Sequence, residues 1–166
     1  MAGNGLQKTG VRITLTLMTV LMLGLIFFFS DQSAETSDAT SGRISGTVIS
    51  LMFPDYIGYP AGRQREIYDR VQHAVRKTAH FTEYMILGIL LRFCLESWFG
   101  KHGFLSPAGW AGGTLYACTD EMHQILSDGR SALWTDVLID STGTLCGVLL
   151  VQLVLSAKRK VRKGTE

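Results

Sequence analysis

Ionisable side chains interrupt three otherwise apolar segments of this chain and are its best candidates for chemistry. In chain order they are Lys77, His80 and Glu83, then Asp120, Glu121 and His123, then Asp136 and Asp140. An ionisable group at the centre of a bilayer costs roughly 2.5–3.5 kcal/mol on insertion scales, so such groups are usually paired or functional. Carboxylates beside an imidazole can transfer protons or hold a polar ligand. We therefore expect function to lie in this set.

The elements that carry these residues read as membrane helices, because about 20 apolar residues rising ~1.5 Å each cross a bilayer. We expect an all-α integral membrane protein with four transmembrane helices in a compact bundle. The expected spans cover residues 13–29, 77–99, 107–126 and 133–156. Residues 1–12 and 157–166 then form cytoplasmic tails, the second one basic, and residues 13–156 form one membrane domain.

The segment between the first two spans is expected to lie outside the membrane. Residues 30–45 are rich in Ser, Thr, Asp and Gly and predict a loop. Residues 44–53 are apolar but too short to span, and the prolines and glycines of residues 54–62 break any helix. A new helical pattern starts at Arg65 and is able to run on into the second span. We expect one or two surface helices here; whether residues 44–75 form a lid stays open.

The charge distribution argues for a membrane and against nucleic acid. The 166 residues carry a net charge of only +2, and the basic residues near the C-terminus more than account for it. A basic tail after an apolar helix is typical of a membrane-surface anchor. The Lys and Arg residues flanking the spans favour both termini on the cytoplasmic side. Cys94, Cys118 and Cys146 lie in separate apolar segments and predict no disulfide framework.

With this topology the polar residues of three spans fall at one depth. At ~1.5 Å per residue, Glu83, Glu121 and Asp140 lie about 22, 17 and 24 Å above the cytoplasmic ends of their helices. Small residues should bring the helices together below this level, chiefly Gly143 and Gly147 at GxxxG spacing. The sequence therefore predicts a shared polar site in the outer half of the membrane.

Four motifs follow one another in this region: R-K-T-A-H-F-T-E-Y at 76–84, A-C-T-D-E-M-H-Q at 117–124, G-R at 129–130 and D-V-L-I-D-S-T-G at 136–143. Together they resemble the VanZ-like family of bacterial membrane proteins. The family pattern reads K-x-x-H-F-x-E-Y, D-E-x-H-Q, G-R and D-x-x-x-N-x-x-G, in that order, and the resemblance covers residues 12–150. Asp140 departs from it by standing where asparagine is usual, so either one of Asp136 and Asp140 is protonated or the two share a basic partner such as Arg130 or Lys77. The resemblance implies a multi-pass protein of the bacterial cytoplasmic membrane with a cell-envelope role, in a family associated with teicoplanin resistance.

The expected ligand-binding set is Lys77, His80, Glu83, Tyr84, Asp120, Glu121, His123, Gln124, Arg130, Asp136 and Asp140. The expected partners are membrane lipids, a lipoglycopeptide or a lipid-linked precursor, with no nucleic acid; nothing fixes the oligomeric state. Arg130 is the expected clamp on an anionic head group, because its planar fork matches phosphate. No cofactor and no metal are expected, since Glu121 and His123 are two residues apart and point to different helix faces.

Three interpretations of the set remain open, besides an ion or proton path, for which four helices without an inverted repeat give little room. The first is a binding site for a lipid head group or a lipid-tailed ligand. The second is a membrane-embedded acid/base enzyme acting on a phospholipid or lipid-linked precursor, with His80, Glu83, Asp120 and Glu121 as catalytic residues. The third is a buried ion-pair network that only fixes helix packing, in which Lys77 or Arg130 neutralises Glu83 and Asp120.

Overall fold

The computed structural model describes residues 2–31, 34–100, 102–124 and 133–163, and side chains over 8–31, 41–100, 102–124 and 133–157. The described residues form helices and no strand, which confirms the all-α prediction. The elements are α1 (Ala2–Ser30), α2 (Ala34–Met52), the short 3-10 helix η1 (Tyr56–Gly58), α3 (Ala61–Phe99), α4 (Leu105–Gln124) and α5 (Trp134–Lys163).

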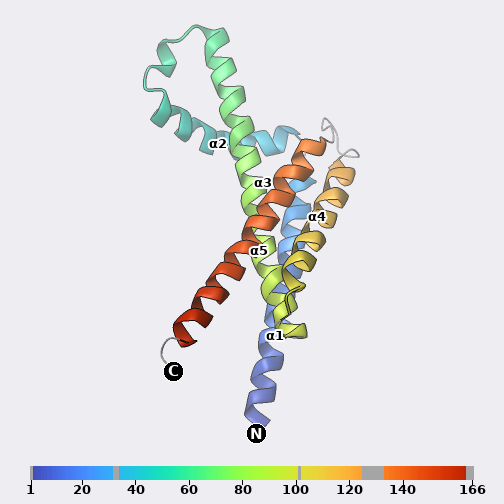
Figure 1. The fold of residues 1–166 in the computed structure, drawn as a ribbon. Coiled ribbons are helices and arrows are strands. Elements are labelled where there is room, and N and C mark those ends of the chain that lie inside the picture. Colours follow the sequence, from blue (N-terminus) through green and yellow to red (C-terminus); the bar gives the residue numbers. More distant parts are fainter. Residues whose placement is uncertain (1, 32–33, 101, 125–132, 164–166) are drawn as a thin grey trace.

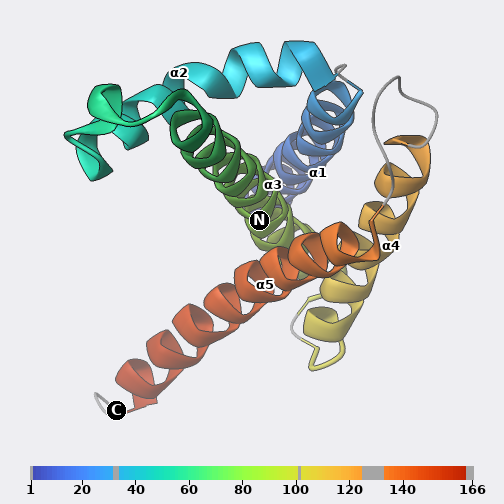
Figure 2. The same cartoon turned by 90° about the horizontal axis from the view of Figure 1, so that it is seen from above.

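Helices α1, α3, α4 and α5 run side by side and alternate in direction, and both chain termini lie at the same end of this bundle (Figure 1). Helix α2 crosses the opposite end, where it reaches from the end of α1 to the protruding first half of α3 (Figure 2). Helix α5 packs mainly on α3 and secondarily on α4. We call the two ends of the bundle the α2 end and the termini end.

Within the described residues, three helices are long and apolar enough to cross a membrane: Lys8–Ser30, Ala61–Phe99 and Trp134–Ala157. The prediction of four spans is therefore confirmed for three. Helix α4 has 20 residues, which is long enough at ~1.5 Å per residue. Its composition is the reason it differs, because the polar run from Asp120 to Gln124 and several glycines dilute its apolar residues.

Large apolar side chains cover the outside of this bundle. Leu17 is 63% exposed, Leu21 64%, Leu115 68% and Leu153 68%. A water-soluble protein rarely exposes apolar surface on this scale, whereas acyl chains solvate it without cost. The exposed leucines of α1, α4 and α5 are thus those of a membrane protein.

The region between the first two spans differs from the prediction. Residues 34–52 form the continuous helix α2 rather than a loop. The small residues that predicted a loop are packing residues: Ser41 and Ser45 are buried, and a Cβ at Gly42 would stand 3.1 Å from the Tyr68 hydroxyl. Close approach to α3 stabilises a helix that its composition alone disfavours.

Other helix bounds also shift. Helix α3 runs unbroken from Ala61, which confirms that the pattern at Arg65 continues into the second span. Helix α1 begins at Ala2 rather than near residue 13, and α5 continues to Lys163, through most of the predicted tail. The α-helical structure is interrupted between Met52 and Ala61, as predicted for this stretch, but the 3-10 helix η1 lies within it and α3 already includes Gly62.

Two glycines of α5 set the position of the polar residues. A Cβ at Gly143 would overlap the carbonyl oxygen of Phe81, and one at Gly147 the carbonyl oxygen of Met85. The predicted close approach at this GxxxG pair is thus confirmed, with α3 as the neighbour. Asp136 and Asp140 precede this contact in the first turns of α5. The close approach therefore places them beside the part of α3 that bears His80.

Candidate functional site

Polar groups from three helices meet at the α2 end of the bundle. Three possible ligand atoms lie within 4.8 Å of one another, one each from His80 on α3, Asp120 on α4 and Asp140 on α5. Asp120 and Asp140 are each only 4% exposed. The predicted convergence of polar groups from three spans is therefore confirmed for these residues, while their roles and their place in the outer half of the membrane stay predictions. We call His80, Glu83, Asp120 and Asp140 the acidic layer.

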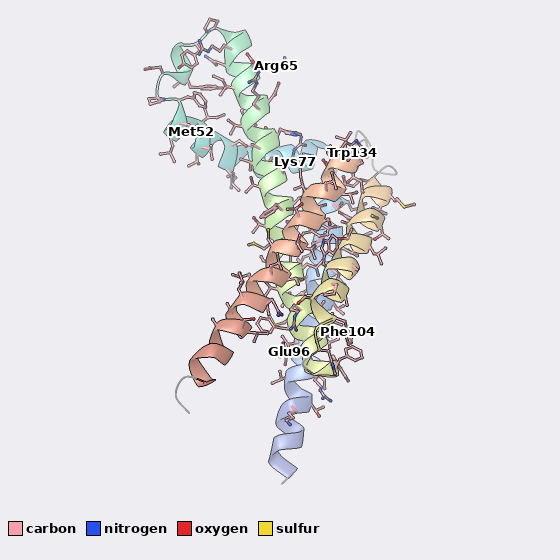
Figure 3. The ribbon with its side chains drawn as sticks, viewed as in Figure 1. Met52, Arg65, Lys77, Glu96, Phe104 and Trp134 are labelled. Carbon is pink, nitrogen blue, oxygen red and sulfur yellow. The ribbon has the colours of Figure 1, made fainter. Side chains whose placement is uncertain are left out.

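Lys77 pairs with a carboxylate at the start of α5. Its ammonium binds Asp136, in line with the predicted basic partner for Asp136 and Asp140, rather than Glu83 or Asp120. The Thr135 hydroxyl also donates to Asp136, at 3.2 Å. Lys77 and Trp134, the first residue of α5, are seen at the same end of the bundle (Figure 3). This pair ties the start of α5 to α3 and leaves the acidic layer without that lysine.

Glu121 is also held by the start of α5. Its Oε1 accepts the backbone N–H of Leu133 at 2.5 Å. A carboxylate placed there satisfies a free N–H and lies at the favourable end of the helix dipole. Glu121 therefore has a structural bond that limits its use as a general base.

Glu83 and Tyr84 complete the layer on α3. The Glu83 Oε2 lies 3.9 Å from the His80 Nδ1. Tyr84 is fully buried, interacts with Asp120, and has its ring 6.3 Å from that of Tyr116. Its ring joins an apolar cluster with Ile26, Leu87 and Ala117. The polar layer is therefore adjacent to the apolar core of the bundle.

A small cavity opens among these polar groups. It has a volume of about 10 Å³ and is lined by Lys77, His80, Glu121, Gln124, Asp136, Ile139 and Asp140. That is room for about one water-sized particle. Within the described part of the chain, the buried Oδ1 of Asp140 has no hydrogen-bond partner. The site is therefore neither a wide pocket nor a fully paired knot of charges.

A much larger and mainly apolar groove of about 770 Å³ lies beside it, between α2 and α3. Its lining residues are Ile44, Val48, Met52, Arg70, Val71, Ala74, Val75, Thr78, Ala79, Thr82 and Glu83. Glu83 thus belongs both to this groove and to the acidic layer. The groove was not predicted from the sequence, because it exists only where α2 lies against α3.

One predicted ligand-binding residue, His123, lies outside both the acidic layer and the lining of the small cavity. His123 faces α1, with its Nδ1 3.8 Å from Asp31 Oδ1 and its ring 4.7 Å from that of Phe27. The reason is the helical spacing already noted, which turns His123 away from Glu121. Gln124 does line the small cavity, and its Nε2 donates to Ser30 Oγ at 2.6 Å. Arg130, the predicted phosphate clamp, lies outside the described residues.

A second polar cluster, near the termini end, was not predicted. Arg92 is 2% exposed, and each guanidinium nitrogen donates a bond: to Glu96 Oε2 at 2.9 Å, to Ser106 Oγ at 3.2 Å and to Gln152 Oε1 at 3.4 Å. Ser106 also donates to Gln152, at 3.3 Å. We call these four residues the Arg92 cluster. An arginine followed four residues later by a glutamate inside an apolar run was the available signal.

The comparisons with known proteins agree with this architecture. The sequence model of the family described as VanZ/LLP1 matches residues 15–155, which include the acidic layer, the Arg92 cluster and the groove. No curated protein and no solved structure matches the chain. Since the match covers most of the sequence, this protein belongs to the VanZ/LLP1 family.

Proposed function

We propose that this protein binds a membrane lipid or a lipid-tailed ligand, with the acyl chain in the groove between α2 and α3 and the head group against the acidic layer. The observation that carries the proposal is the apolar groove of about 770 Å³ that shares Glu83 with the polar residues. Its volume falls in the range of roughly 300–1,000 Å³ that is usual for small-molecule sites.

The lining of the groove becomes more polar towards the bundle. Ile44, Val48 and Met52 of α2 and Val71 and Val75 of α3 form its apolar part, which Arg70 borders. Towards the bundle the lining changes to the polar residues Thr78, Thr82 and Glu83.

Glu83 links the groove to the interior of the bundle. It lies 3.9 Å from His80 and interacts electrostatically with Asp120. A ligand in the groove would thus present its polar end to the same groups that converge from α4 and α5. A basic head-group nitrogen matches this acidic surface directly.

We also propose a cellular location and an orientation in the membrane for this protein. Three apolar spans and the family suggest a bacterial cytoplasmic membrane, with both termini cytoplasmic and the α2 end in the outer leaflet. Binding there would alter how lipid-tailed compounds reach the surface, and a contribution to teicoplanin resistance would be one consequence.

Filling the groove tests this proposal. Ala74 and Ala79 are exposed groove residues, so Ala74→Phe and Ala79→Phe should occupy the ligand volume without overpacking the core. We expect each to weaken binding of a fluorescent phospholipid to the purified protein at least about tenfold, which corresponds to ~1.4 kcal/mol.

Ala111→Phe is the matched control, since Ala111 is an exposed alanine of α4 outside the groove. It should leave binding unchanged. Equal lipid affinity in all three variants and the parent would rule out the groove as the binding site. Glu83→Gln separates the head-group contact: it should weaken an amine-bearing lipid more than an uncharged diacylglycerol.

A membrane-embedded enzyme is the second candidate, and the approach of His80 to Asp120 favours it. A carboxylate and an imidazole within 4.8 Å of each other need only a small side-chain movement to reach the hydrogen-bond distance at which they can share a proton during acid/base catalysis. If the protein turns over lipid, cells that express Asp120→Asn should lose a change in lipid composition that the parent produces. Identical lipid profiles in parent, variant and empty-vector cells would argue against catalysis.

A further inference from the structure

We infer that His80, Asp120 and Asp140 bind a divalent transition-metal ion of the class that accepts imidazole and carboxylate ligands together, such as Zn²⁺ or Mn²⁺. None of these three residues lines the proposed acyl-chain groove, although they belong to the acidic layer that the proposed head group would approach.

The separation of the three groups suits one ion. Zinc–ligand distances of about 2.1 Å place two ligand atoms about 3.4 Å apart in a tetrahedral arrangement and at most about 4.2 Å apart across the ion. The three candidate ligand atoms already lie within 4.8 Å of one another. Small side-chain rotations that move the ligand atoms by up to about one ångström complete the geometry.

Asp140 gives an independent indication of a bound cation. Its side chain lines the small cavity, the residue is 4% exposed, and its Oδ1 has no hydrogen-bond partner within the described ranges. A buried carboxylate oxygen without a donor is costly, and a metal ion is a strong partner for it. The cavity volume of about 10 Å³ admits one particle of that size.

The surrounding charges point the same way. Asp140 interacts electrostatically with Asp120, Asp136, Glu121 and Glu83. From α3, Lys77 faces the cavity but is bound to Asp136, and the backbone of Leu133, just before α5, holds Glu121. Asp120 and Asp140 lie close to His80, and a divalent cation among the three would be attracted by both carboxylates.

The kinds of ligand select the kind of metal. Ca²⁺ and Mg²⁺ prefer all-oxygen sites, whereas a histidine nitrogen among carboxylates favours Zn²⁺, Mn²⁺ or Fe²⁺. Glu83, 3.9 Å from His80, is placed to orient the imidazole, as carboxylates next to metal-bound histidines commonly do. Gln124 and Glu121 in the cavity wall can hydrogen-bond a water on the ion.

The test uses the full chain in detergent, stripped with a chelator and then titrated with Zn²⁺ or with Co²⁺ as a spectroscopic probe. We expect one ion per chain by mass spectrometry of the metal, and a visible Co²⁺ absorption band that Zn²⁺ abolishes. Asp140→Asn should weaken Zn²⁺ binding by about tenfold or more. His123→Gln, which removes the histidine that faces α1, should bind like the parent.

Loss of binding in Asp140→Asn counts only if the variant keeps the parent's elution volume and unfolding temperature. A measurement on the parent alone covers the case in which it does not fold: Zn²⁺ should protect His80 from diethyl pyrocarbonate, followed peptide by peptide, more than it protects His123. Substoichiometric metal, no Co²⁺ band, or equal modification of His80 with and without Zn²⁺ would each overturn the site. Ala79→Phe should still bind metal, so failure of the lipid proposal and failure of this one are distinguishable.

Discussion

The bundle buries charge in two places, the Arg92 cluster and the acidic layer, and it treats them differently. Each guanidinium nitrogen of Arg92 has a partner on α3, α4 or α5. In the acidic layer, carboxylates from α3, α4 and α5 approach each other, and Asp140 Oδ1 lacks a donor among the described groups. One fold can thus satisfy a buried charge fully and, some turns away, leave several acids crowded.

This difference separates a structural role from a functional one. A paired charge that bonds three helices fixes their packing, and little remains for a ligand to do. Crowded carboxylates cost stability in the folded state and persist where a ligand, an ion or a proton is needed. The purely structural interpretation, a network that only holds helices together, therefore fits the Arg92 cluster better than the acidic layer.

The largest expected effect is at Arg92. Arg92→Ala removes three hydrogen bonds and leaves Glu96 partly buried without its cation. We expect a loss of about 3–5 kcal/mol in unfolding free energy, the usual cost of breaking a buried pair, read from thermal unfolding in detergent. A variant as stable as the parent would contradict the structural role of the Arg92 cluster.

The contact between α3 and α5 comes next, because it supports both clusters. Gly147→Ala places a methyl group against the Met85 carbonyl, and we expect a loss of about 1–3 kcal/mol from overpacking. Gly24→Ala in α1 is the matched control, since a Cβ there meets nothing within 4 Å. Equal unfolding temperatures for the two variants would contradict the close packing of α5 on α3.

In the acidic layer, removing a charge should stabilise the protein rather than destabilise it. Asp140→Asn removes one of several neighbouring charges and keeps the side-chain shape. In metal-free buffer we therefore expect unchanged or higher stability, by up to about 1 kcal/mol. Destabilisation as large as that of Arg92→Ala would show that Asp140 has a partner outside the described residues, and that the two clusters are alike.

The smallest effect is expected at an exposed ion pair. Arg70 and Glu66 are 2.7 Å apart, with side chains 78% and 59% exposed. Arg70→Ala should change the unfolding free energy by less than about 1 kcal/mol, because solvent screens the pair. The result calibrates the Arg92 measurement: a comparable loss at both arginines would mean that burial is not what distinguishes them.

Part of the site was predictable because helices have a fixed rise and period. Knowing which end of each span carries His80, Asp120 and Asp140 is enough to place them at one depth. The same period predicted that Gly143 and Gly147 share a face and that His123 points away from Glu121. The partner of Lys77 was not predictable, since the rotation of α5 about its axis decides whether Asp136 or Asp140 comes within reach.

The missed features share a cause. Small residues such as Gly42 and Ser45 are compatible with a loop or with a tightly packed helix, and only contact with Tyr68 and its neighbours on α3 selects the helix. The groove depends on that choice, because one of its walls is α2. Arg92 was overlooked because its partners Ser106 and Gln152 come from distant parts of the chain.

By itself the sequence determined an all-helical membrane chain, the helix faces that hold small residues, and the common level of the polar groups. Apolar length and helical periodicity are local properties, so they can be read without coordinates. The tertiary structure alone decided which charges pair, that α2 and α3 enclose an apolar groove, and that Asp140 faces a small polar cavity. These outcomes depend on the rotation and approach of whole helices, which the sum of many weak contacts sets.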